Sequence, residues 1–138
     1  MKRVLFVCIG NGGRSQMAEA FFNHFSAGRR VAMSAGTQPA TSVSRTAIAA
    51  MAELGIDISA QKPKPLTQRL IQQAERIITM GCDVAESCPA GFHPSEDWGL
   101  EDTQGQPLEK VRLIRDQIRE RVLALLADLG EPHSAETM

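Results

Sequence analysis

The chain has 138 residues, 43% of them hydrophobic and 22% charged, which is the size and composition of one globular domain. Its 15 Lys and Arg residues nearly balance 16 Asp and Glu residues, so the net charge of −1 provides no basic face for nucleic acid or an anionic membrane. The apolar run after Arg3 is too short for a signal sequence, and no apolar run of about 18 residues follows. We therefore expect a cytoplasmic protein that is neither secreted nor membrane-spanning.

The hydrophobic pattern predicts strands and helices in turn along the chain. Residues 4–9 form an apolar run without polar alternation, which is typical of a strand covered on both faces. Residues 14–27 then place apolar side chains three and four residues apart, as on one face of a helix. By the same criteria we predict strands at 31–33 and 76–80, and helices at 42–54, 66–73 and 111–129. Residues 81–107, rich in glycine and proline, are expected to form a long loop, and loops of that length are usually functional.

This order of elements predicts an α/β fold. Strands that alternate with helices form βαβ units, so we expect a three-layer sandwich with a parallel sheet of about four strands between helices on both faces. The single domain is expected to span residues 1–130, with residues 131–138 as a flexible tail. Ligands of such sheets bind beyond the carboxyl ends of the strands, and Cys8 lies at that end of the first strand.

A thiol, an arginine and several glycines follow one another at the first strand-to-helix junction. The segment consists of Cys8, Ile9, Gly10, Asn11, Gly12, Gly13, Arg14 and Ser15. Its glycines allow inward-pointing N–H groups at a helix N-terminus, and Arg14 can donate two hydrogen bonds to a tetrahedral oxyanion. The same surroundings favour the nucleophilic thiolate of Cys8. A buried packing cysteine before a plain turn is the alternative, but a cysteine followed after five residues by Arg-Ser favours the oxyanion site.

The loop also carries a family resemblance. The residues from Val7 to Glu19, V-C-I-G-N-G-G-R-S-Q-M-A-E, resemble the active-site loop of low-molecular-weight protein tyrosine phosphatases, and more closely that of thioredoxin-coupled arsenate reductases with the same fold. Residues 34–36, 55–59 and 97–102 also match, so the similarity covers nearly the whole chain. The resemblance implies that Cys8 is the nucleophile and Arg14 the oxyanion clamp. It further implies that Asn11 and Ser15 hold the loop and the thiolate, and that Asp102 is the general acid.

The chain departs from the family pattern at three positions. Thr103 follows Asp102 where the family usually has proline, and Gly13 stands where these reductases often carry a second cysteine. Many of the arsenate reductases that this chain resembles have a potassium site near the loop. The residues that form that site match Asn11, Glu19 and Ser34, but Lys64 stands where a carboxylate ligand is expected. Either the lysine ammonium replaces the ion or the site is absent. We predict no metal and no cofactor.

Cys82 and Cys88 follow the third predicted strand at its carboxyl end, on the same edge of the sheet as Cys8. Reduction of arsenate takes two electrons, which one disulfide formed from two thiols supplies, whereas a phosphatase needs one thiol. In a helix the two cysteines would lie about 9 Å apart along the axis, beyond the roughly 7 Å between Cα atoms that a disulfide allows, so the pair requires a loop. In the arsenate reductases that this chain resembles, a comparable pair of cysteines forms this disulfide. Packing thiols, or a metal site completed by His93, are the alternatives.

Three functions remain open. The first is an arsenate reductase in which Cys8, Cys82 and Cys88 relay a disulfide to thioredoxin or another thiol donor. The second is a phosphatase acting on phosphotyrosine or small aryl phosphates through a Cys8 phospho-enzyme, although Thr103 and Gln104 stand where such phosphatases carry an aromatic residue. The third is a non-catalytic thiol sensor or metal-binding module. We favour the reductase, with some residual phosphatase activity.

Overall fold

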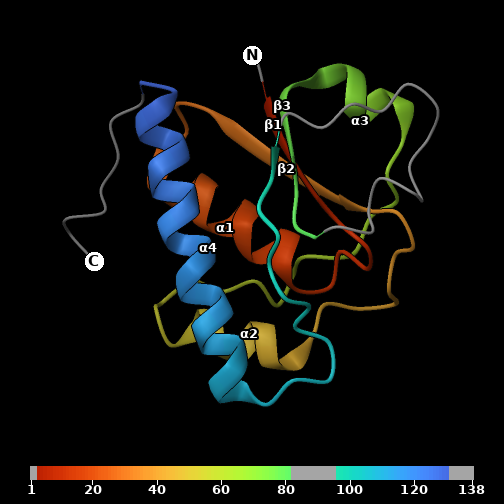
Figure 1. Ribbon diagram of the computed structural model, residues 1–138, viewed down its shortest axis with the longest axis vertical. Helices are drawn as coiled ribbons and strands as arrows, with labels where there is room; N and C mark the ends of the chain where they lie inside the picture. Colours follow the sequence, from red (N-terminus) through yellow and green to blue (C-terminus); the bar gives the residue numbers. More distant parts are fainter. Residues whose placement is uncertain (1–2, 82–95, 131–138) are drawn as a thin grey trace.

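The computed structural model describes residues 3–81 and 96–130 (Figure 1). The elements are, in order, β1 (Arg3–Cys8), α1 (Arg14–Ser26), β2 (Val31–Gly36), α2 (Arg45–Ala52), α3 (Gln68–Gln73), β3 (Ala74–Thr79), β4 (Glu96–Asp97) and α4 (Leu108–Asp128). The expected tail at residues 131–138, together with Cys82, Cys88 and His93, lies outside the described residues. Within the described ranges, none of the helices is long and apolar enough to cross a membrane.

The four strands form one sheet in the order β2-β1-β3-β4, and every neighbouring pair is parallel. This confirms the predicted α/β fold with a parallel sheet of four strands. Cys8 at the end of β1 pairs in register with Gly36 at the end of β2, and Thr79 at the end of β3 pairs with Asp97 of β4. The carboxyl ends of all four strands therefore meet at one edge of the sheet.

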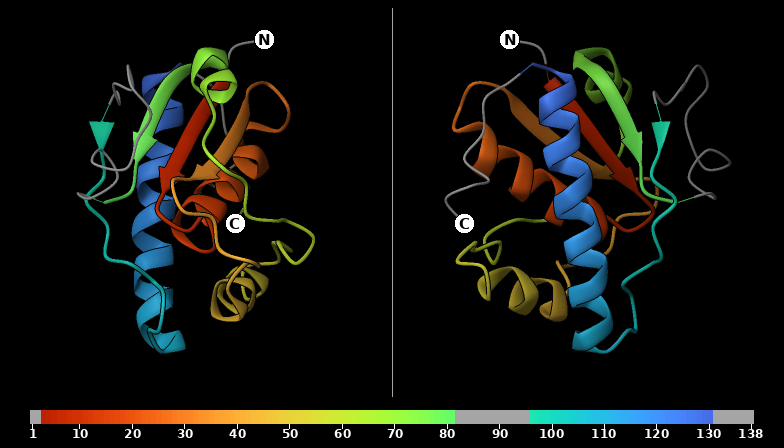
Figure 2. Two further views of the ribbon diagram at one scale, coloured as in Figure 1. Left: turned by 90° about the vertical axis from the view of Figure 1, so that its right-hand side faces the viewer. Right: turned by 60° about the vertical axis from the view of Figure 1, so that its left-hand side comes forward.

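Both faces of β1 are covered, as its unbroken apolar run predicts. Successive side chains of a strand point to opposite faces. Val4 and Phe6 join the larger core, which α1 and α4 complete, while Leu5 and Val7 join a smaller cluster covered by residues of α3. All four side chains are fully buried. Figure 2 shows α4 running along one face of the sheet, on the same side as α1.

The observed boundaries differ from the predicted ones where local hydrogen bonds decide them. The second strand extends to Gly36 because residues 34–36 continue the pairing with β1. The second helix begins at Arg45 instead of Ser42, since the Ser44 side chain caps it by accepting a hydrogen bond from Ala47 N at 3.4 Å. β4 falls inside the predicted loop because its two residues carry no hydrophobic period.

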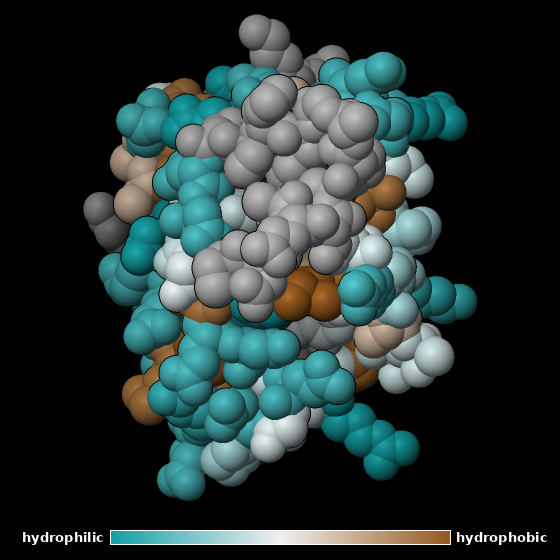
Figure 3. Space-filling model, turned by 45° about the vertical axis from the view of Figure 1, so that its right-hand side comes forward, coloured by the Kyte–Doolittle hydropathy of each residue, from teal (hydrophilic) through white to brown (hydrophobic). Residues whose placement is uncertain are grey.

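Large apolar side chains are almost all covered in the described part of the chain. On the face shown in Figure 3, hydrophilic side chains surround small, separate apolar patches. Leu113 of α4, 60% exposed, is the large apolar side chain that stands out to solvent in the described part of the chain.

Candidate active site

The Cys8 thiol lies at the floor of the site. Cys8 ends β1 and is only 2% exposed. Its Sγ lies 2.8 Å from Ser15 Oγ and accepts a hydrogen bond from the Asn11 backbone N–H at 3.1 Å. Hydrogen bonds directed at a sulfur stabilise its negative form, so this setting suits a thiolate nucleophile.

The backbone of the following loop is fixed by hydrogen bonds from the segment 37–44 to its carbonyls. The carbonyls of Cys8, Ile9, Gly10 and Gly12 accept hydrogen bonds from the amides of Thr37, Gln38, Ala40 and Ser44, at 3.2, 2.8, 2.8 and 2.7 Å. In a trans peptide the N–H points opposite to the carbonyl of the same peptide unit. The N–H groups of the same peptide units therefore point away from residues 37–44, and one of them, the Asn11 N–H, reaches the Cys8 sulfur. Together with the start of α1, this arrangement suits a bound anion.

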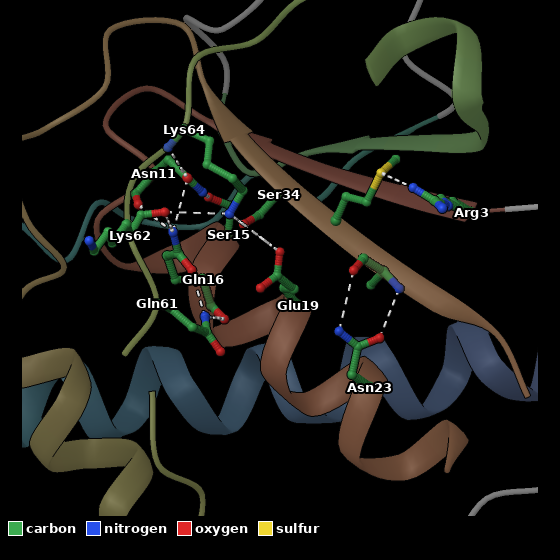
Figure 4. Close-up of polar contacts among 12 residues, drawn as sticks. Arg3, Asn11, Ser15, Gln16, Glu19, Asn23, Ser34, Gln61, Lys62 and Lys64 are labelled. Carbon is green, nitrogen blue, oxygen red and sulfur yellow. Dashed lines mark hydrogen bonds and ion pairs between the residues drawn. The ribbon is translucent and has the colours of Figure 1, made fainter. Parts of the chain in front are cut away.

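Asn11 holds the shape of this loop from inside. Asn11 is fully buried and has a positive φ of 51°, a conformation that asparagine tolerates better than most residues. Its Nδ2 donates to Ser15 Oγ at 2.7 Å, and its Oδ1 accepts from Gln16 Nε2 at 3.0 Å and from Lys64 N at 2.9 Å (Figure 4). The same Ser15 hydroxyl contacts the Cys8 sulfur, so the asparagine orients it.

Gln16 extends this network, and sequence reasoning missed it. The side chain is fully buried. Its Nε2 also donates to the carbonyls of Asn11 at 3.1 Å and Lys62 at 3.0 Å, and its Oε1 accepts from Gln61 Nε2 at 2.5 Å. Its contacts with residues 61–62 tie the loop to a segment far along the chain, and a single sequence carries no signal for them.

Arg14 is buried at the wall of the site, with 5% of its surface exposed. Its Nη1 donates to the carbonyls of Met80 at 3.3 Å and Leu100 at 3.0 Å. Its Nη2 lies 3.7 Å from Asp102 Oδ1. The guanidinium is thus anchored on one edge and faces the predicted acid on the other.

Asp102 is half-exposed, and a turn fixes its carboxylate, which accepts a hydrogen bond from Gln104 N at 3.0 Å. The next residue, Thr103, is buried against the loop. A Cβ built on Gly13 would come within 2.2 Å of Thr103 Oγ1. Two departures from the family pattern are thereby linked, because the threonine fills the space that a side chain at position 13 needs.

These groups surround one cavity of about 350 Å³. It is lined by Cys8, Ile9, Gly10, Gly12, Gly13, Arg14, Gln38, Ala40, Ser44, Asp102, Thr103, Gln104 and Gly105. Apart from Ile9, the lining side chains are small or polar, and none of the lining residues is aromatic. The cavity therefore brings the Cys8 thiol and the Arg14 guanidinium together, and no aromatic side chain lines it to stack on an aryl ring.

Lys64 places its ammonium among oxygens beside the loop (Figure 4). Its Nζ lies 3.4 Å from Lys62 O, 3.5 Å from Ser34 Oγ and 3.6 Å from Glu19 Oε1. Ser34 Oγ also donates to the Glu19 carboxylate at 3.0 Å. The lysine ammonium thus places a positive charge close to three oxygens, one of which belongs to a carboxylate. In the described ranges, no group of three or more His, Cys, Asp and Glu side chains is arranged to hold a metal ion.

Of the site residues predicted from the sequence, the structure brings together around this cavity Cys8, Ile9, Gly10, Gly12, Gly13, Arg14 and Asp102. Asn11 and Ser15 do not line the cavity but contact the Cys8 sulfur. Cys82 and Cys88 lie outside the described residues. Gly81, the last described residue before them, lies directly against the guanidinium of Arg14.

Comparisons with known proteins place this geometry in a family. The family described as low molecular weight phosphotyrosine protein phosphatase matches residues 3–135. A glutaredoxin arsenate reductase from Synechocystis is 41% identical over 134 residues, which are 94% of this chain and 100% of that protein. The solved structure of an arsenate reductase in the phosphate binding state is 39% identical, with a TM-score of 0.78 over 93% of this chain and 98% of that one.

A second solved structure represents the phosphatases. The low-molecular-weight protein tyrosine phosphatase from T. tengcongensis is 27% identical, with a TM-score of 0.83 over 93% of this chain and 99% of that one. The two kinds of relative share one fold, and the higher identities are to proteins named arsenate reductase. The chain belongs to the low-molecular-weight phosphotyrosine protein phosphatase family, among the members related to arsenate reductases.

Proposed function

We propose that this protein is an arsenate reductase that converts arsenate to arsenite through Cys8, Cys82 and Cys88. The observation that carries the proposal is a buried thiol, which accepts a hydrogen bond from a loop amide and opens with Arg14 and Asp102 onto one cavity of about 350 Å³. This cavity suits a compact tetrahedral oxyanion, and the relatives at 41% and 39% identity are arsenate reductases.

In the first step arsenate binds to the loop N–H groups and to Arg14. The Cys8 thiolate attacks arsenic and forms a sulfur–arsenic bond, while one arsenate oxygen leaves as water. Asp102, whose carboxyl group lies beside Arg14, gives the departing oxygen its proton. Ser15 holds the thiolate before the attack through its hydroxyl.

In the second step the thiolate of Cys82 attacks the Cys8 sulfur. A Cys8–Cys82 disulfide forms, and the electron pair of the sulfur–arsenic bond stays on arsenic, which leaves as arsenite. Cys88 then attacks Cys82, frees the Cys8 thiolate and leaves a Cys82–Cys88 disulfide. The sum is arsenate and two thiols giving arsenite, water and one disulfide. The roles of Cys82 and Cys88 rest on the chemistry and on their place in the sequence.

A dithiol donor of the thioredoxin or glutaredoxin class closes the cycle by reducing the Cys82–Cys88 disulfide. Relatives of both kinds are known, namely the glutaredoxin arsenate reductase from Synechocystis and a thioredoxin-dependent arsenate reductase from Corynebacterium glutamicum. Thiols that must return to the reduced state at each turnover suit the cytoplasm, where we place the protein.

The decisive experiment follows NADPH oxidation with arsenate, coupled either to thioredoxin and its reductase or to glutaredoxin, glutathione and glutathione reductase. The same preparations are assayed for hydrolysis of p-nitrophenyl phosphate. We expect Cys8→Ser, Cys82→Ser and Cys88→Ser to abolish arsenate reduction, while the last two variants keep hydrolysis. Normal arsenate reduction by Cys82→Ser would contradict the relay.

Hydrolysis of phosphate esters is the second candidate function. It needs only Cys8, Arg14 and Asp102, and the family includes phosphatases. The cavity lining, which offers no aromatic side chain among the described residues, disfavours phosphotyrosine. Efficient phosphatase activity without arsenate reduction would establish this function instead. A thiol sensor is the third, and it predicts that Cys8→Ser leaves the measurable function intact.

A further inference from the structure

Gly81 stands at a point where the backbone does not require glycine. It follows β3 by two positions, and it is not one of the five described glycines with positive φ. Its distinguishing feature is contact with Arg14. A Cβ built on Gly81 would lie 2.7 Å from Arg14 Nη1, closer than real Cβ contacts. The glycine is therefore explained by the space that the guanidinium occupies.

Arg14 depends on that space for its orientation. The same Nη1 donates to the carbonyls of Met80 and Leu100, and in this position it occupies the space that a Cβ on residue 81 would need. A methyl group at position 81 would push Nη1 away and break at least one of these bonds. Because the guanidinium is rigid and planar, displacing Nη1 also turns the opposite edge, which lies next to Asp102.

We propose that Gly81 is a positioning residue for oxyanion binding, which acts by leaving room for Arg14 in its anchored orientation. The proposal deepens the function proposed above and rests on it. Gly81 also immediately precedes Cys82, and the alternative role is that glycine serves the backbone of the segment that follows. The two roles predict different losses in the same variant.

The test is Gly81→Ala, with binding of inorganic phosphate to the reduced protein measured by calorimetry. This readout requires no arsenate reduction. We expect phosphate affinity to fall about tenfold or more, since a charge-assisted hydrogen bond to the anion is misaligned. Hydrolysis of p-nitrophenyl phosphate should fall in parallel. The thermal midpoint should change little, because the displaced atom is the far end of a long side chain.

The matched control repeats the substitution in an Arg14→Lys background. Lysine has no atom equivalent to Nη1, so adding Gly81→Ala there should cause no further loss of phosphate affinity. An equal loss in both backgrounds would overturn the proposal. If Gly81→Ala fails to fold, recovery of folding in the double variant supports the proposal, and failure of the double variant overturns it.

Two further outcomes separate this proposal from the proposed function. Unchanged phosphate affinity in Gly81→Ala, with slower arsenate reduction, would overturn it and assign Gly81 to the segment that follows. Wild-type protein that binds phosphate but reduces no arsenate would refute the reductase. In that case, weakened binding in Gly81→Ala would still support the positioning role.

Discussion

Asn11 offers the sharpest test of how the oxyanion loop is held. The side chain is fully buried, donates to Ser15 and accepts from Gln16 and Lys64, while its backbone adopts a φ of 51°. Asn11→Ala removes all three hydrogen bonds and places alanine in the left-handed region. Asn11→Gly removes the same hydrogen bonds but tolerates that conformation. The pair of variants therefore separates hydrogen bonding from backbone strain.

The expected magnitudes follow from the contacts. Losing the acceptor leaves the Lys64 N–H without this partner, which costs about 1–3 kcal/mol, and the two other bonds cost about 1 kcal/mol each. Gln16 keeps two carbonyl partners, which limits its share. We expect Asn11→Gly to lower the free energy of unfolding by about 3–4 kcal/mol. The left-handed conformation costs Asn11→Ala about 1 kcal/mol more.

Urea denaturation followed by circular dichroism measures both variants against wild type. The thermal midpoint should fall by about 3–5 °C for each kcal/mol in a chain of this size. Hydrolysis of p-nitrophenyl phosphate should fall as well, since Ser15 loses the donor that orients it toward Cys8. A loss below about 1 kcal/mol in both variants would refute the reasoning, because the network would then contribute little.

Three further predictions concern contacts around and away from the cavity. Gly13→Ala should sharply reduce hydrolysis of p-nitrophenyl phosphate, because the new Cβ would lie 2.2 Å from Thr103 Oγ1. Adding Thr103→Ala to this variant should restore much of the activity, and no restoration would exclude the clash as the cause. Lys64→Met should lower the free energy of unfolding by about 1 kcal/mol. In thermal unfolding, potassium chloride should restore more of this lost stability than choline chloride, and equal effects of the two salts would contradict the prediction. Two arginines of α4 hold the pKa of Glu53 at about 2, below its ordinary value of 4.5. The ionised Glu53 therefore stabilises the folded state fully above pH 4.5, and this stabilisation is lost as the pH falls through 2. Glu53→Gln should therefore be less stable than wild type at pH 7 in urea denaturation, and the difference should shrink steadily as the pH is lowered from 4.5 to 2. A pH-independent difference would contradict the pairing.

The fold could be predicted from the sequence because its determinants are local and periodic. The apolar run that forms β1 and the three- and four-residue spacing in α1 each identify an element without reference to the rest of the chain. Their alternation then implies parallel pairing, which the observed strand pairs confirm. β4 was missed because a strand of two exposed residues has no pattern to detect. It is paired only because β3 presents its edge there.

How much of the site can be predicted also depends on how far apart in the sequence the contacting residues lie. The loop motif was visible because its contacts join residues close in sequence, such as Cys8 to Ser15 and Asn11 to Ser15. The contacts that aim Arg14 span 66 and 86 positions and end on backbone carbonyls, which every residue type possesses. Such contacts leave only indirect traces in a sequence. One trace is a glycine whose φ is not positive, as at position 81, because the missing side chain then reflects a neighbour that needs its room.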